Sequence, residues 1–255
     1  MSQFKVGAEA GNFTDEDKGQ VQNNKFTSLP QGKSIYVKVI DKNAKMSYFG
    51  YGIYRPSVNT FAAKNPSKKS AKGYPVENLT PFDRAWKYHA DKSKEFQDEH
   101  SQEAYKYMPK LRGSFGFYDL TTGEQIVVDF TKKQAEAVQS AINRYDKRLD
   151  RMAFELHKTS SSRPTDVVVT LEPIPFPDED LTEEQLNNFE NAPKEFDYSL
   201  FEGLVYEMDD EEQIETLQRV GFDVSLIGLE TTKKEGGEFE GVKDADDIKD
   251  EELPF

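Results

Sequence analysis

The residues best suited to chemistry form a basic and aromatic stretch near the N-terminus. Residues 33–72 hold nine Lys or Arg side chains and one acid, Asp41, so this stretch carries a net charge of +8. Cations can follow the phosphates of a nucleic acid strand, and aromatic rings can stack on its bases, at about 1–3 kcal/mol per base. The stretch indicates a surface for single-stranded nucleic acid. The plainer alternative is a set of tyrosines at the rim of a core, with lysines that solvate it.

A second candidate strand, residues 111–120, adds two side chains to this surface. Its alternation places Phe115 and Phe117 on a core face with Leu111, and Arg112 and Tyr118 on the other face. The same reasoning on the earlier strands selects the outward-facing tyrosines and the neighbouring loop cations. The candidate nucleic-acid-binding residues are Tyr36, Lys38, Lys42, Lys45, Tyr48, Tyr54, Arg55, Phe61, Lys64, Lys68, Lys69, Lys72, Arg112 and Tyr118.

Catalytic motifs are missing from the sequence. The chain has no cysteine and three histidines without metal-ligand spacing, which argues against thiol catalysis and a zinc site. No glycine-rich nucleotide loop is present. Acidic runs at residues 178–180 and 209–212 could hold magnesium, but solvated helix starts are the commoner use of such runs. We therefore expect a non-catalytic protein without metal or cofactor, and a nuclease remains as an alternative.

The elements that must position these residues follow from periodicity. A turn separates the first two strands, and residues 56–75 show no periodicity, which predicts a long basic loop. A capping-box pattern at residues 131–134 begins an amphipathic helix that we expect to reach about residue 149. Another helix is expected at residues 80–107. The predicted strands span residues 34–41, 46–54, 111–120, 124–130, 152–158 and 166–172.

This order favours a mainly β fold with helical additions. A helix before the last two strands of a small antiparallel sheet matches the wiring of an OB-type barrel of five to six strands. A ferredoxin-like fold would need a second helix between its early strands, and a sandwich would need none at this place. The expected parts are an N-terminal polar arm at 1–30, an OB-like domain at 31–174 with an insertion at 56–110, an acidic helical segment at 175–230 and a flexible tail at 231–255.

Charge is distributed very unevenly along the chain. Residues 1–174 hold 27 Lys and Arg against 21 Asp and Glu, a net charge of +6, whereas residues 175–255 hold 6 against 26, a net charge of −20. The acidic part includes predicted helices at 182–185 onward, 196–208 and 209–220. This division suggests a polyanion-binding body with an acidic C-terminal region.

The last residues carry the most specific motif. Asp250, Glu251 and Glu252 run into Leu253, Pro254 and Phe255, which ends the chain as given. This tip resembles the C-terminus of bacterial and bacteriophage single-stranded DNA-binding proteins, although isoleucine is usual where Leu253 stands. The long insertion is more similar to phage versions, and the lack of cysteine excludes the zinc-binding phage type. The resemblance implies an OB domain and recruitment of replication, recombination and repair proteins by the tip.

Several alternatives remain open beside this expectation. A strand-annealing protein, an RNA-binding domain and an acidic protein-interaction factor would share the same charge division, and self-association is also open. The longest apolar runs are too short to span a bilayer, and residues 1–5 lack the apolar core of a signal peptide. We therefore expect a soluble protein with no membrane partner, in the bacterial cytoplasm, during phage infection if the resemblance holds.

Overall fold

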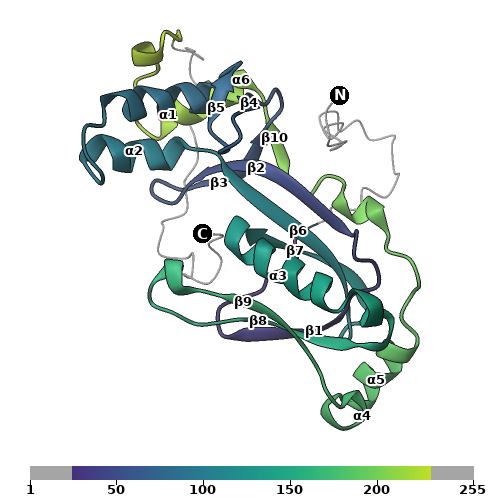
Figure 1. The fold of residues 1–255 in the computed structure, drawn as a ribbon. Coiled ribbons are helices and arrows are strands. Elements are labelled where there is room, and N and C mark those ends of the chain that lie inside the picture. Colours follow the sequence, from purple (N-terminus) through teal and green to yellow (C-terminus); the bar gives the residue numbers. More distant parts are fainter. Residues whose placement is uncertain (1–24, 231–255) are drawn as a thin grey trace, which may run out of the picture. The chain divides into compact units, whose positions relative to one another are not determined.

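The computed structural model describes residues 25–230 (Figure 1). It is a mixed α/β fold whose main sheet has eight mostly antiparallel strands in the order β10–β3–β2–β6–β1–β8–β9, with β7 beside β6. The predicted antiparallel sheet with added helices is confirmed. The predicted closed barrel is wrong, because the two ends of this strand order, β10 and β9, do not pair with each other.

Two compact units divide the described chain. Unit 1 comprises residues 25–48 and 112–204, and unit 2 comprises residues 49–111 and 205–230. The strands of unit 1 are β1 Lys33–Lys38, β7 Glu124–Thr131, β8 Ala153–Lys158 and β9 Val169–Pro173. Two strands, β2 Lys45–Ile53 and β6 Lys110–Asp119, have residues in both units. The strands of unit 2 are β3 Val58–Ala63, β4 Lys68–Lys69, β5 Pro75–Glu77 and β10 Tyr206–Met208. Unit 1 has helices α3 Lys132–Arg144, α4 Pro177–Asp180 and α5 Glu183–Glu190, and unit 2 has α1 Pro81–Lys92, α2 Glu99–Tyr107 and α6 Asp210–Arg219.

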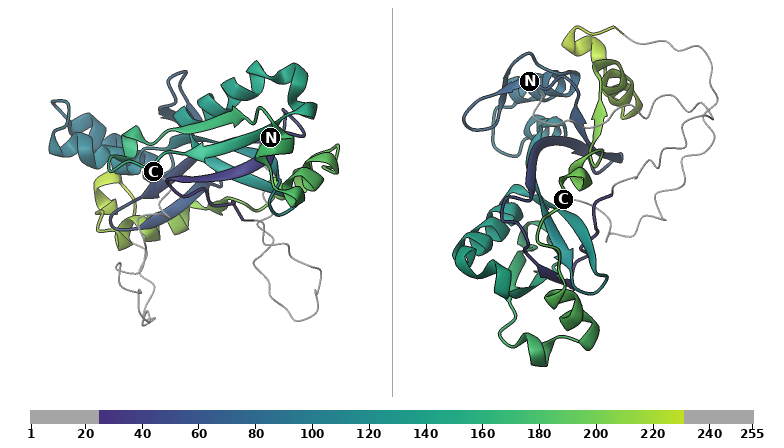
Figure 2. Two further views of the ribbon diagram at one scale, coloured as in Figure 1. Left: turned by 90° about the horizontal axis from the view of Figure 1, so that it is seen from below. Right: turned by 90° about the vertical axis from the view of Figure 1, so that its right-hand side faces the viewer.

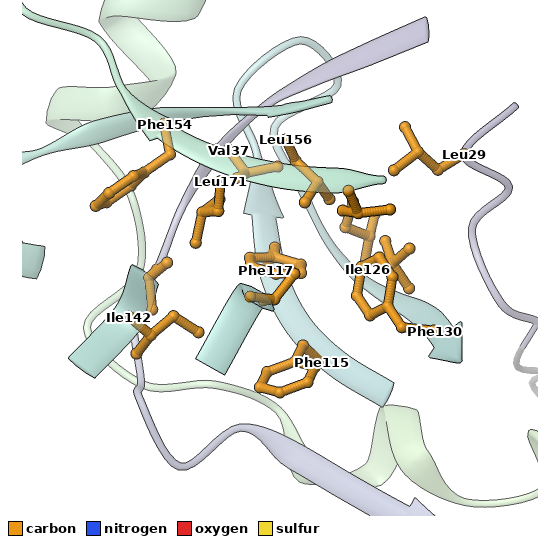
Figure 3. Close-up of a cluster of buried hydrophobic side chains, with 14 of the residues drawn as sticks. Leu29, Val37, Phe115, Phe117, Ile126, Phe130, Ile142, Phe154, Leu156 and Leu171 are labelled. Atoms are coloured by element: carbon orange, nitrogen blue, oxygen red, sulfur yellow. The ribbon is translucent and has the colours of Figure 1, made fainter. Parts of the chain in front are cut away.

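The core of unit 1 lies between its strands and α3. Phe115 and Phe117 of β6 meet Phe154 of β8 and Ile142 of α3 in a cluster of buried apolar side chains (Figure 3). The predicted inward face of β6 is therefore confirmed. The predicted capping box is also present, since the backbone N–H of Thr131 donates to Gln134 over 3.2 Å. The helix ends earlier than expected, at Arg144, and the chain continues as a 3-10 helix to Arg151.

The opposite face of the unit 1 sheet is covered by residues 174–204, here called the strap. Leu181 packs with Tyr118 and Leu120 near one end of the face, and Phe196 packs with Ala44 and Val127 farther along it. The strap contains nine acids and one lysine. Figure 2 shows its helices α4 and α5 at the end of the unit 1 sheet.

The predicted helix at residues 196–208 is wrong. The chain forms a 3-10 turn at Tyr198–Phe201 and then strand β10, which pairs in parallel with β3. Phe196, Leu200 and Leu204 have α-helical spacing, but they pack on the sheet from a segment whose one helical part is the short 3-10 turn. Gly203, with φ of 70°, interrupts any helix there.

Gly116 allows the strap to approach the sheet. A Cβ at this position would clash with the ring of Phe196, whereas a Cβ at Gly113 would lie 2.8 Å from the Cβ of Ala135 on α3. The two glycines thus permit close packing on opposite faces of β6.

Gly116→Ala is expected to lower the free energy of unfolding by about 1–3 kcal/mol, the usual cost of overpacking. Urea denaturation measures this loss. Phe196→Ala removes the clashing ring, so the double variant should be more stable than the sum of the two single losses predicts. Purely additive losses would show that Phe196 does not pack on Gly116.

Unit 2 has its own aromatic core. Tyr51, Phe61 and Phe82 pack with ring centroids 5.0–5.8 Å apart. The predicted loop at residues 56–75 is wrong, because it contains β3 and β4, and β5 begins at its end. The abundant Lys, Ser, Pro and Asn residues conceal a strand whose buried members are Val58, Phe61 and Ala63.

The predicted helix at residues 80–107 is two helices. Thr80 caps α1 in a complete capping box with Asp83, as the Thr-Pro start indicates. The chain breaks at Ser93 and turns through Gln97, whose φ is 65°. Asp98 then caps α2 by accepting a hydrogen bond of 2.7 Å from the backbone N–H of Ser101.

Candidate nucleic-acid interface

The predicted binding face of unit 1 has the expected direction but is covered. Tyr36, Lys38 and Tyr118 all point to the side opposite α3, where the strap lies, and Tyr118 is buried. The Lys38 ammonium donates to the carbonyl of Phe189 over 3.0 Å and lies 4.3 Å from the centroid of its ring. Burial lowers the pKa of Lys38, an effect that the charge of Asp150 partly offsets. Tyr118 is therefore not exposed as expected, and Tyr36 and Lys38 are partly buried.

Arg112 and Tyr48 are also buried, which corrects their assignment to an open surface. The Arg112 Nε donates to Asp129 of β7 over 2.6 Å, and the hydroxyl of Ser114 donates to the same carboxylate over 2.8 Å. Tyr48 is 4% exposed, and burial together with the charge of Asp129 raises its pKa. The available signal was Asp129, the one acid within the apolar run 126–130, since a buried carboxylate needs a cation.

Lys69 and Phe61 also belong to the interior of unit 2. The Lys69 ammonium donates to Ser67 over 2.6 Å and to the Tyr51 hydroxyl over 3.1 Å, and it lies 3.5 Å from the fully buried Asp83. Burial lowers the pKa of this ammonium, and Asp83 partly offsets the effect. Phe61 is 1% exposed, so its predicted role as a stacking surface is wrong.

Lys42 and Lys45 are exposed in unit 1 and tie the β1–β2 turn to the α3 region. The Lys42 ammonium lies 2.7 Å from Asp146, and Lys45 donates to Gln139 over 2.6 Å. Sequence reasoning did not select four more exposed cations, which lie at the end of α3 and in the 3-10 helix after it: Arg144, Lys147, Arg148 and Arg151.

The remaining predicted residues are exposed in unit 2. Residues 49–76 hold five cations and no acid. Four of these cations are exposed, and Tyr54 adds a ring that is 40% exposed. This exposed group, called the basic set, consists of Tyr54, Arg55, Lys64, Lys68 and Lys72, together with Tyr74 described below.

The local environment of the basic set is mixed. The Arg55 guanidinium lies 5.1 Å from the centroid of the Tyr54 ring. Lys68 pairs with Glu77 over 3.1 Å, and both side chains are largely exposed. Burial raises the pKa of Glu207, and the positive charge of Lys64 offsets part of this rise. Exposed pairs of this kind are worth about 0–1 kcal/mol, so a phosphate can replace the acid at small cost.

An aromatic pair beside the basic set was missed by sequence reasoning. Tyr74 is 46% exposed and stacks on Trp86 of α1, with centroids 5.8 Å apart and planes 9° apart. Gly73, with φ of 86°, places the loop against Phe49, and a Cβ added at Gly73 would lie 3.6 Å from the Phe49 ring. The available signal was the chain's single tryptophan near a lysine-rich loop.

The basic set has two groups at opposite ends of β3. Tyr54 and Arg55 lie in the turn before this strand, and Lys64 follows its last residue. Six strand residues at about 3.3 Å each separate the two groups by about 20 Å. The arrangement offers contact points at both ends of β3 for an extended strand.

Some candidate features have no counterpart in this part of the molecule. Within residues 25–230, His, Asp and Glu side chains nowhere gather in a group of three that could hold a metal ion, and this includes the acidic runs at 178–180 and 209–212. Across the same described range, no helix combines the length and apolar character needed to cross a membrane. The predicted tip, Asp250 to Phe255, lies outside the described residues, as do residues 1–24 of the predicted arm.

Comparisons of the chain with protein-family models, with curated proteins and with solved structures find no match.

Proposed function

We propose that this protein binds single-stranded DNA without sequence preference during replication, recombination or repair. The observation that carries the proposal is the basic set, with four exposed cations and exposed Tyr54 and Tyr74 in a segment without acids. Cations along the backbone and rings under the bases are what sequence-tolerant binding of single strands requires.

We also propose that the acidic C-terminal tip recruits other replication proteins. A Leu-Pro-Phe segment can place an aromatic ring in an apolar pocket of a partner, while the preceding acids meet a basic rim. This part of the proposal rests on the sequence motif alone.

Competition among nucleic acids tests the first proposal. The full chain is titrated with labelled oligo-dT and challenged with unlabelled oligo-dT, RNA and duplex DNA of equal length. Oligo-dT is expected to compete better than duplex DNA, because stacking needs unpaired bases. Stronger competition by RNA would favour the RNA-binding alternative, and equal competition by duplex would leave only non-specific attraction to phosphates. Absence of binding would favour a protein-interaction factor.

A further inference from the structure

The surface covered by the strap has the composition of a nucleic-acid site. Tyr36 and Tyr118 supply two rings and Lys38 supplies a cation, all on the face of the unit 1 sheet opposite α3. Lys38 and Tyr118 are paired residues on neighbouring strands, so the cation and one ring lie side by side. A core needs no lysine at this place, and its burial is costly unless the ammonium finds partners.

The strap covers this face with polar contacts and with the buried side chain of Leu181. The ammonium of Lys38 meets one carbonyl and the ring of Phe189. The side-chain amides of Gln185 and Asn188 donate to Thr121 and to the carbonyl of Leu120, over 3.1 and 2.9 Å. Leu186 and Phe189 of α5 are only partly buried. Farther along the chain, Phe196 is buried against β6.

The charge of α4 and α5 opposes any phosphate that approaches this face. Residues 177–190 hold six acids and no cation. A DNA strand near Lys38 would therefore attract the lysine and repel the helices that cover it. These two helices lie at the end of the unit 1 sheet (Figure 2), and Phe196 belongs to a separate buried cluster with Ala44 and Val127.

We propose that the sheet face with Tyr36, Lys38 and Tyr118 is a second binding site for single-stranded DNA, which opens when α4 and α5 move away about the Phe196 anchor. The inference rests on the proposed function, and it concerns a different surface from the basic set. In the open state a phosphate replaces the Phe189 carbonyl at Lys38, and bases stack on the two tyrosines in place of Leu181, Leu186 and Phe189. The apparent affinity of this site is its intrinsic affinity reduced by the open fraction.

A reversible cross-link tests the proposal. The chain has no cysteine, so Thr121→Cys with Gln185→Cys introduces the only two thiols. Their native side chains touch, and a short, reducible, thiol-specific cross-linker joins α5 to the β6–β7 turn after folding. Affinity of the full chain for oligo-dT is measured before cross-linking, after it and after reduction. We expect about a ten- to hundredfold loss on cross-linking, equivalent to one or two stacked bases, with full recovery on reduction.

A control pair isolates the effect of the strap. Lys132→Cys with Glu136→Cys, at an exposed pair within α3, receives the same cross-linker and removes one charge of each sign. Its affinity should not change when cross-linked. If the strap-locked protein binds as tightly as its reduced form, the second site does not exist, and the proposed function still stands. If neither form binds oligo-dT, the proposed function itself fails.

Discussion

Replacing Asp129 by alanine is expected to lower the free energy of unfolding by about 3–5 kcal/mol, the usual cost of breaking a buried ion pair. The Arg112 side chain is 7% exposed and Asp129 is 11% exposed, so removal of the carboxylate leaves a guanidinium inside unit 1 without its charged partner. Ser114 loses its acceptor in the same change. Urea or thermal denaturation of the full chain measures the loss.

Glu77→Ala is the matched control for this change. It also removes a carboxylate from an ion pair, that of Lys68, but the two side chains are 59–70% exposed. The expected loss is below about 1 kcal/mol, because water replaces the acid. Equal losses in the two variants would contradict the burial of the Arg112–Asp129 pair.

Removal of the four exposed cations of the basic set is expected to have the largest effect on binding. Each phosphate contact on a single strand contributes about 0.7 to the slope of log affinity against log salt concentration. Alanine at Arg55, Lys64, Lys68 and Lys72 should therefore make the slope shallower by about 3 if each cation meets one phosphate. Since the electrostatic part of binding vanishes near about 1 M salt, this difference corresponds to a loss of affinity on the order of several thousandfold near 50 mM salt.

A second set of four alanines separates this local effect from net charge. The exposed Lys92, Lys94, Lys132 and Lys133 lie outside the basic set, and their removal changes the net charge by the same amount. The slope for oligo-dT should change by much less than in the first variant. Similar slopes in the two variants would show that binding depends on overall charge and not on residues 54–74.

The sequence predicts the strands and helix starts of this protein well where local chemistry decides them. Alternation defined β1, β2 and the β6–β7 hairpin, and side-chain caps at Thr80 and Thr131 marked where α1 and α3 begin. The sequence did not predict β3, whose apolar residues are sparse, and it predicted a closed sheet where the observed sheet is open. Both features depend on pairing between distant strands, such as that of β10 with β3, which no local pattern records.

Prediction of the candidate site from the sequence was limited for the same reason, since its exposure depends on distant parts of the chain. Alternation placed Tyr36, Lys38 and Tyr118 on the correct face, but it could not show that a segment about 60–150 residues away covers that face. Tyr48 and Arg112 were misjudged because their partner, Asp129, lies on another strand. Exposure is a property of tertiary packing, so the sequence gives the direction of a side chain more readily than its access to a ligand.

The fluorescence of Trp86 tests the central claim most directly. This residue is the only tryptophan of the chain and stacks on Tyr74 beside the lysines of the basic set. Titration with oligo-dT is expected to give a saturable change in its emission, with an affinity that falls steeply as salt is raised, because bases approach the Tyr74–Trp86 pair. The change should be lost in the variant without the four cations of the basic set. An emission that stays constant through saturating oligo-dT, with binding confirmed by a labelled strand, would contradict the assignment of DNA binding to this surface.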